Sequence, residues 1–375
     1  MEFRDLRRQY QYNKQNIDYA IWKVLDTSHF IQGKQVTELE EKLADYVNVK
    51  HCVTCANGTD ALQLALMTWN IGEGDAVFVP DFTFFSSGEV VSAVGASPIF
   101  VDVDIDTYNI DSEKLETAIK TVLQKGAMIP KAIIAVDLFG LPANYPELRH
   151  IADQYGLYLL EDAAQGFGGA LGGRKACSFG DISTTSFFPA KPLGCYGDGG
   201  AIFTDNDEWA MLIRSLAVHG KGLSKYDNVR IGMNSRLDTL QAAILLEKFS
   251  VFIEKELRES NKLADFYTEQ LKDIVKTPVV KSGFYSSWAQ YTIQLEDSQV
   301  RQNVQEILKA QEIPTAVYYP KPLHMQQAFR KYEYLDNQYE VTNGLCSKVL
   351  SLPFHPYMEI EEILAVTRTI KKILV

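Results

Sequence analysis

Hydrophobic residues recur along this chain in two periods, which predict where helices and strands lie. Apolar positions three and four residues apart predict helices over 7–26 and 36–47. Over residues 52–162, short apolar runs of strand length alternate with helical patterns. The apolar runs cover 52–56, 76–80, 98–103, 132–136 and 157–162, and the helical patterns between them cover 61–66, 86–94, 112–123 and 146–155. Such alternation is typical of an α/β fold whose mostly parallel sheet lies between helices.

The rhythm changes in the second half. A helical pattern begins at Asn206, and another runs from Leu237 to about Leu271, long enough to link two domains. A smaller set of elements follows, with strands expected at 291–295 and 315–319 and helices at 300–311 and 361–374. We therefore predict a large domain over residues 1–245, which includes the N-terminal helices. Residues 246–375 would form the linking helix and a small C-terminal α/β domain.

The composition and net charge of the chain limit the kinds of partner that it can bind. Of 375 residues, 46% are hydrophobic and 23% are charged, which is ordinary for a globular protein. The formal net charge of −11 argues against binding nucleic acid or an anionic membrane, because both require a basic surface. No apolar run is long enough to span a membrane, and the start Met-Glu-Phe-Arg-Asp does not resemble a signal peptide. We expect a cytoplasmic protein.

The five cysteines form an odd set in a long chain and do not suggest a disulfide framework. Cys52 and Cys55 have the spacing of a metal or redox pair, but no second pair or histidine cluster accompanies them. The intervening Val53 and Thr54 favour a strand instead, so we expect no metal site.

One lysine stands out. Lys191 lies in Ser-Phe-Phe-Pro-Ala-Lys-Pro-Leu-Gly-Cys-Tyr-Gly-Asp-Gly-Gly (186–200), with no other basic residue nearby. A desolvated lysine loses its preference for the charged form and becomes a nucleophile suited to imine chemistry. The alternative is a lysine that merely reaches out of a buried turn. Ser186, five residues earlier, could bind an anion close to the amine.

Three other positions suggest a site at the carboxyl ends of the strands. Gly58 and Thr59 join a strand to a helix, where free N–H groups can bind a phosphate, although they could equally belong to a plain helix cap. Asp162 ends an apolar strand and could pair with a protonated pyridine nitrogen, or cap a helix. Phe84 could stack on a flat ring or belong to the core.

The stretch around Lys191 resembles the lysine loop of the DegT/DnrJ/EryC1/StrS family, whose members are sugar aminotransferases dependent on pyridoxal 5′-phosphate (PLP). Two further stretches carry the resemblance, Glu-Asp-Ala-Ala-Gln (161–165) and Arg-Ile-Gly-Met-Asn-Ser-Arg-Leu-Asp-Thr-Leu-Gln-Ala-Ala (230–243). It extends over almost the whole chain and implies a fold-type I aminotransferase.

The resemblance implies roles for individual residues. Lys191 would bind PLP as an imine and carry protons, and Asp162 would hold the pyridine nitrogen. Asn234 would reach the phosphate of the other subunit's cofactor, in a homodimer with shared sites. The expected PLP contacts are Gly58, Thr59, Phe84, Asp162, Gln165, Ser186, Lys191 and Asn234, and the expected substrate contacts are Arg230, Tyr318, Tyr319 and His324.

Within the family, the lysine loop is most similar to that of members acting on UDP-linked N-acetyl-3-oxo-glucuronate, which supply O-antigen and other surface glycans. L-glutamate would be the amino donor, and Arg230 could meet the C6 carboxylate. Such members tend to have His-Tyr-Pro where this chain has Tyr318-Tyr319-Pro320. A 4-oxo-6-deoxy or 3-oxo-6-deoxy sugar on UDP or dTDP is therefore the alternative substrate.

Other classes fit less well. PLP-dependent sugar dehydratases of this family have histidine in place of the lysine, whereas this chain has Lys191. A non-enzymatic sensor would not need Lys191, Asp162 and Gln165 together. A Rossmann dehydrogenase is disfavoured because no G-x-G-x-x-G follows the first strand.

Overall fold

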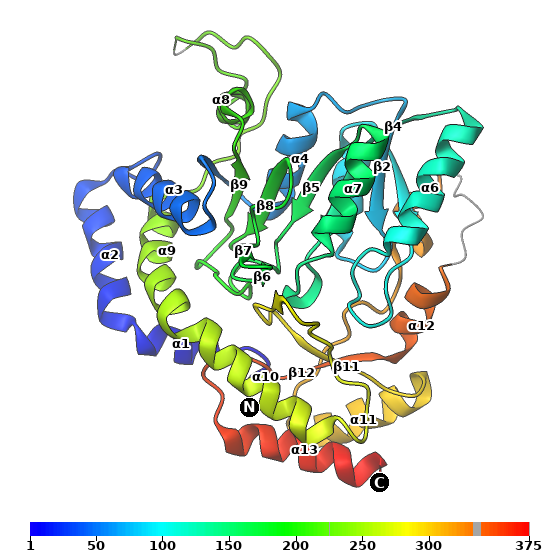
Figure 1. Ribbon diagram of the computed structural model, residues 1–375. Helices are drawn as coiled ribbons and strands as arrows, with labels where there is room; N and C mark the ends of the chain where they lie inside the picture. The colour runs from blue at the N-terminus through cyan, green and yellow to red at the C-terminus, as the bar shows by residue number, and fades with distance from the viewer. Residues whose placement is uncertain (225, 333–338, 375) are drawn as a thin grey trace.

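The computed structural model describes residues 1–224, 226–332 and 339–374. A seven-stranded sheet forms its centre, with the strand order β1-β9-β8-β5-β4-β2-β3 (Figure 1). The neighbours β8, β5, β4, β2 and β3 pair in parallel, whereas β9 runs antiparallel to both β8 and β1. The strands are β1 (His51–Cys55), β2 (Asp75–Pro80), β3 (Ser97–Val101), β4 (Ile129–Val136), β5 (Tyr158–Asp162), β8 (Ile182–Ser186) and β9 (Gly200–Thr204).

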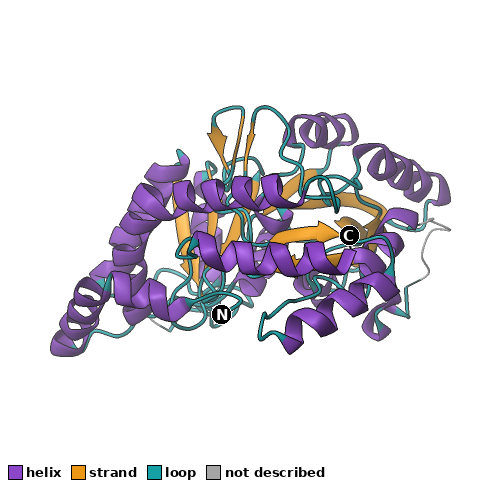
Figure 2. Ribbon diagram, turned by 90° about the horizontal axis from the view of Figure 1, so that it is seen from below, coloured by secondary structure: helices purple, strands orange, loops and turns teal. Residues whose placement is uncertain are grey.

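Alternate residues of each strand are buried on opposite faces, as the pleat of a sheet requires. Val77 and Val79 of β2 pack in the cluster that contains α4 (Gly58–Thr68), α5 (Phe85–Ala93) and α8 (Asp207–Leu216). Ala76 and Phe78 face the cluster formed with α6 (Ser112–Lys125) and α7 (Tyr145–Tyr155). Helices thus cover both faces of the sheet (Figure 2), which confirms the predicted α/β class.

Three helices precede the sheet, α1 (Leu6–Tyr12), α2 (Lys14–Thr27) and α3 (Lys34–Val47). The single helix expected over 7–26 is broken at Asn13, whose side-chain amide donates to the carbonyl of Glu247. This tertiary contact holds Asn13 outside helical geometry. The long helix is confirmed, since α9 (Thr239–Val251) continues through a π-helical turn (Phe252–Glu256) into α10 (Leu257–Leu271).

A second core lies at the C-terminal end of the chain (Figure 1, bottom). It surrounds the antiparallel pair β11 (Tyr291–Gln294) and β12 (Val349–Leu352), with α10, α11 (Ser298–Ala310) and α13 (Ile360–Leu374) around it. The three short strands β6 (Ala170–Leu171), β7 (Arg174–Lys175) and β10 (Phe284–Tyr285) form a separate sheet, and α12 (Glu340–Lys348) precedes β12.

The prediction of a strand at 315–319 is wrong. Only one isolated bridge, from Ala316 to Ser351, forms in that segment. The partner of β11 is β12, all four residues of which are buried. The aromatic side chains of 318–319 pack toward the candidate site instead, so their hydrophobicity does not reflect sheet pairing.

The predicted domain boundary at residue 245 falls inside α9, and the later residues Leu323, Phe329 and Leu345 pack on the core of the central sheet. The division at this residue number therefore stays a prediction. Among the described residues, no helix is both long and apolar enough to cross a membrane.

The pleat of β1 places Cys52 and Cys55 on opposite faces of the sheet. Cys55 is buried in the cluster beside α4, whereas Cys52 is buried on the opposite face, beside α3. Their thiols point to different sides of the sheet and cannot share a metal ion. All five cysteines are buried free thiols.

Candidate active site

The candidate residues gather where the strands of the central sheet end. Asp162 is the last residue of β5, Ser186 is the last residue of β8, and Gly58 follows β1. Because parallel strands end at one edge of a sheet, these elements bring the three residues to one place, as the sequence pattern predicted. The loop after β8 carries Lys191 back toward this edge.

Lys191 is partly buried, and its environment favours the free amine. Burial lowers the pKa of this lysine to about 8, the nearby carboxylate of Asp162 opposes the shift, and the positive charge of Arg4 adds to it. The loop is fixed locally, because the Lys191 N–H donates to the carbonyl of Phe188 at 2.9 Å. The amine therefore has the character that imine chemistry needs.

Asp162 is buried and held on both oxygens. The Ser87 hydroxyl donates to Oδ2 at 2.8 Å, and the Ala164 N–H donates to Oδ1 at 3.2 Å. Burial raises the pKa of Asp162, while these hydrogen bonds and the charge of Lys191 act in the opposite direction. A carboxylate kept in this way has a fixed orientation and can hold a cationic partner.

The start of α4 forms a close cradle against Ser186. A Cβ added to Gly58 would lie 2.8 Å from the Ser186 Cβ, so only glycine allows this approach. Asn57 caps the helix by accepting from the Asp60 N–H at 2.8 Å, while the N–H groups of Gly58 and Thr59 have no acceptor within the helix. The hydroxyls of Thr59 and Ser86 lie 2.7 Å apart beside them. This set of donors fits a phosphate group.

Gln165 and Tyr319 are hydrogen-bonded to each other at the site. The Gln165 side chain accepts from the Phe139 N–H at 2.8 Å and donates to the Tyr319 hydroxyl at 3.1 Å. Burial raises the pKa of Tyr319, so this phenol stays protonated. Phe84 is 55% exposed, which excludes a core role, and its ring centre lies 6.4 Å from that of Tyr319.

His324 is fixed by an acid that the sequence reasoning did not identify. Its ring Nδ1 lies 2.6 Å from Oδ2 of Asp81, and its backbone N–H donates to Oδ1 at 2.8 Å. Asp81 is completely buried directly after β2, and the His324 ring stacks on Tyr339. Tyr318 contacts Phe3 edge-on, with ring centres 6.2 Å apart.

Arg230 lies elsewhere, on a loop that projects from the body beside α8 (Figure 1). Asn234 lies at the base of this loop, next to the buried Ser235, whose hydroxyl accepts from the Ala56 N–H at 3.0 Å. Arg230 shares a groove with Met67 and Asn70 at the C-terminal end of α4, roughly 15 Å along the helix from Gly58. Its guanidinium donates to the Ser215 hydroxyl, and Asn234 is exposed and accepts from Arg236. Among the described residues of one chain, the hydrogen bonds of these two side chains go to Ser215 and Arg236, and neither goes to Lys191.

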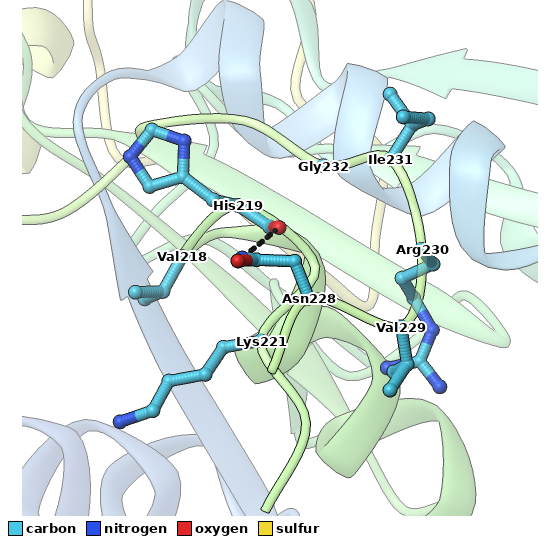
Figure 3. Close-up of a pocket in the computed structure, with 8 residues that line it drawn as sticks. All are labelled: Val218, His219, Lys221, Asn228, Val229, Arg230, Ile231 and Gly232. Carbon is cyan, nitrogen blue, oxygen red and sulfur yellow. Dashed lines mark hydrogen bonds between the residues drawn. The ribbon is translucent and has the colours of Figure 1, made fainter. Parts of the chain in front are cut away.

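The same loop lines an open groove of about 690 Å³ (Figure 3). The side chains of His219, Lys221 and Arg230 point in different directions there, so they do not converge on one anion within a single chain. The described residues also contain no group of three or more metal-ligating side chains.

The sequence reasoning missed Ser86, Ser87, Asp81 and Arg4. Ser86 and Ser87 come two and three residues after the predicted aromatic Phe84, so their place on the first turn of α5 was the available signal. Asp81 likewise follows a predicted strand end. Arg4 had no signal, because its contact with the Lys191 carbonyl spans 187 positions of the chain.

The residues present fit PLP. The donors at the start of α4 suit its phosphate, Asp162 suits its pyridine nitrogen, and the Lys191 amine suits its aldehyde. This fit rests on the cradle between Gly58 and Ser186 and on the buried acid–lysine pair, independently of any likeness to other proteins.

Known proteins agree with the geometry. The chain is 45% identical to UDP-2-acetamido-2-deoxy-3-oxo-D-glucuronate aminotransferase of Pseudomonas aeruginosa, over 96% of both chains. It is 35% identical to dTDP-3-amino-3,6-dideoxy-alpha-D-galactopyranose transaminase of Aneurinibacillus thermoaerophilus, over 99% of this chain and 98% of that one.

Solved structures are also similar. An aminotransferase from Brucella abortus matches with a TM-score of 0.97 at 48% identity, covering 100% of this chain and 99% of that chain. The NtdA protein of Bacillus subtilis, with the bound cofactor pyridoxamine 5′-phosphate (PMP), matches with a TM-score of 0.87 at 30% identity. The match covers 96% of this chain and 82% of that chain. The family model itself matches residues 11–371. This chain belongs to the DegT/DnrJ/EryC1/StrS aminotransferase family.

Proposed function

We propose that this protein is a PLP-dependent aminotransferase that moves an amino group from L-glutamate to the C3 keto carbon of a nucleotide-linked sugar. Our best candidate for the sugar is UDP-N-acetyl-3-oxo-glucuronate. The observation that carries the proposal is the position of Lys191, whose pKa burial lowers to about 8, at the same sheet edge as the buried Asp162 carboxylate. The relatives from Pseudomonas and Aneurinibacillus are both named for 3-amino or 3-oxo sugars, which supports C3.

PLP, when bound, supplies an aldehyde for amines and an electron-accepting ring. Nζ of Lys191 would hold this aldehyde until the amino donor takes its place. The same nitrogen then takes the proton from the α-carbon of glutamate, and in the second half-reaction it delivers a proton to the sugar carbon that receives the nitrogen. Asp162 would keep the pyridine nitrogen protonated, while Gly58, Thr59 and Ser186 would orient the phosphate.

The direct test is to incubate the purified protein with glutamate and a panel of UDP- and dTDP-linked keto sugars. Product mass and the position of the new amine, read by mass spectrometry and NMR, identify the substrate. We expect amination at C3 of the glucuronate. Amination of a 6-deoxy sugar alone would establish the alternative substrate, and no amination of any sugar would overturn the proposal.

A homodimer with shared sites is part of the proposal. Tyr19, Trp22 and Leu25 form an exposed apolar face on α2, each more than half exposed, and Leu223 and Ile231 are exposed on the projecting loop. Apolar surface of this kind on a folded chain marks an interaction site. A second copy would cover it and bring its own Asn234 and Arg230 to this chain's Lys191. A cytoplasmic location stays a prediction.

Mixing two inactive variants tests the shared site. If Lys191 and Asn234 of one site come from different subunits, hybrids of Lys191→Ala and Asn234→Ala dimers contain one intact site and one doubly damaged site. Random exchange of subunits should then restore up to about a quarter of wild-type activity. The measurement is turnover before and after subunit exchange, and a control mixture without exchange should stay inactive. A fully active monomer would contradict the prediction.

The role of Arg230 is tested by substrate comparison. If its guanidinium from the second subunit binds the C6 carboxylate, Arg230→Ala should lower kcat/KM for the uronate by about 1.5–3 kcal/mol, roughly ten- to a hundredfold. Arg230→Lys should recover only part of this loss, because ammonium lacks the planar fork. A 6-deoxy sugar is the control, since its C6 is a methyl group. Equal losses on both sugars would assign Arg230 to structure or to the nucleotide.

A further inference from the structure

The segment before α1 lies directly against the lysine loop. Nη2 of Arg4 donates a hydrogen bond to the backbone carbonyl of Lys191 at 2.9 Å. On its other side, the carbonyl of Phe3 accepts from the Phe354 N–H at 3.0 Å. Arg4 is therefore held between the loop that carries the reactive amine and the C-terminal core.

We propose that Arg4 is a positioning residue for Lys191, whose guanidinium fixes the backbone of the lysine loop through its hydrogen bond to the Lys191 carbonyl and keeps a permanent positive charge next to this loop. A cationic neighbour and desolvation are the two devices that make a lysine amine nucleophilic. Arginine suits this role because its guanidinium does not lose its proton in proteins. The inference rests on the proposed function for the role of Lys191.

The charges around this pair are few. Lys191 faces Asp162 from β5 and Arg4 from the N-terminal segment. Arg4 in turn faces Glu256 of the π-helical turn, and its own pKa is lowered by burial. Oε1 of Glu256 already accepts from the Gln9 amide at 2.9 Å and the Tyr357 hydroxyl at 2.6 Å. Within the described part of the chain, Arg4 forms no ion pair, so its charge is not cancelled by direct contact with a carboxylate.

Two other groups experience the same charge. Burial lowers the pKa of Lys248 on α9 to about 8, and Arg4 adds to this shift. Burial also lowers the pKa of His355 to about 4, again with a contribution from Arg4. Three basic groups on three different segments, including Lys191, are thus shifted toward their neutral forms around one guanidinium.

The test measures the Lys191 amine itself, without turnover. The full-length chain, freed of cofactor, is acetylated with a trace of acetic anhydride at a series of pH values. Mass spectrometry of the peptide containing Lys191 then gives the midpoint at which the amine becomes reactive. Arg4→Met removes both the charge and the hydrogen bond, Arg4→Gln keeps a donor without the charge, and Arg4→Lys keeps a charge without the fork.

We expect the wild-type midpoint near pH 8. Arg4→Met and Arg4→Gln should each raise it by about half a unit, a roughly threefold loss of free amine at neutral pH, while Arg4→Lys should stay near the wild type. Arg8→Met is the matched control, because Arg8, one turn further on in α1, anchors the N-terminal part of the chain to Glu362 and to the Tyr357 carbonyl but is not among the charges that shift the pKa of Lys191. Its midpoint should not move.

An unchanged midpoint in Arg4→Gln would overturn the inference. If circular dichroism shows that Arg4→Met does not fold, Arg4→Gln alone provides the test. An equal rise in Arg8→Met would overturn it too, since that would reflect general loosening of the segment. These outcomes are separate from those of the sugar assay. An active aminotransferase with an unshifted midpoint refutes only this inference, and shifted midpoints in a protein that aminates no sugar refute only the proposed function.

Discussion

Lys191→Ala is expected to abolish sugar amination, lowering kcat/KM by at least about 10⁴-fold. General acid–base catalysis alone contributes about 10²–10⁴-fold, and this variant also loses the nucleophile. Among the described residues, burial lowers the pKa of two other lysines as well. Lys248 on α9 is directed at the ring of Tyr196, and Lys175 donates to the Tyr46 carbonyl, so neither can substitute for Lys191. Steady-state turnover with glutamate and the aminated sugar measures the loss.

The covalent bond itself provides a second measurement for the same variant. Wild-type protein loaded with PLP should be yellow, lose this absorbance on borohydride treatment, and carry the cofactor mass on the peptide containing Lys191. Lys191→Ala should bind the cofactor only reversibly and show no added mass. Lys120→Ala, an exposed lysine paired with Glu116 on α6, is the control and should behave as the wild type. Near-normal turnover of Lys191→Ala would remove this lysine from the mechanism.

Asp162→Asn is expected to cost about 2–4 kcal/mol of transition-state stabilisation, roughly 30- to 1000-fold in kcat/KM. The amide keeps the size of the side chain but cannot hold a protonated pyridine nitrogen by charge. Because the Ser87 and Ala164 hydrogen bonds fix the orientation of the carboxylate, a water molecule should not replace it well. The measurement is kcat/KM together with the absorbance spectrum of the bound cofactor.

Ser87→Ala separates charge from orientation. The Ser87 hydrogen bond opposes the rise in the Asp162 pKa, so its removal should raise that pKa further. On acidification, the Asp162 carboxylate is then protonated at a higher pH than in the wild type. The acid limb of the kcat/KM profile should therefore move to higher pH. At neutral pH the loss should be only about 1 kcal/mol, near fivefold. An unchanged acid limb would show that Asp162 does not control this step.

The proposed sharing of active sites between two subunits changes how the projecting loop is interpreted. The groove on this loop is the largest in volume of those lined by Arg230, yet its basic side chains diverge and no acid–lysine pair accompanies them. The residues that fit PLP instead lie at the sheet edge around Lys191 and Asp162. The loop acquires a catalytic role only if a second copy receives it, which makes the mixing experiment the decisive one for Asn234.

Between residues 52 and 162, the order of strands and helices could be predicted from the sequence alone, because burial on a pleated strand and on one face of a helix leaves periods of two and 3.6 in the chain. The strand β8 was not predicted, because its Ile-Ser-Thr-Thr-Ser sequence contains no apolar run. The lysine loop, the end of β5 and the start of α4 could be marked as candidates in the same way, since each combines a chemically unusual residue with a strand end. The choice between these roles and plain helix caps came from the family resemblance. Position relative to a strand end is local information. It needs no knowledge of distant contacts.

Contacts between distant segments were decided only by the tertiary structure. The 315–319 run looked like a strand, but β12 occupies the edge of β11, and Tyr319 packs against Gln165 instead. Asp81 meets His324 across 243 positions, and Arg4 meets Lys191 across 187. Such pairs leave no periodic trace, because hydrogen bonding between two side chains or a side chain and a carbonyl depends on where the folded elements meet, not on the pattern of either segment.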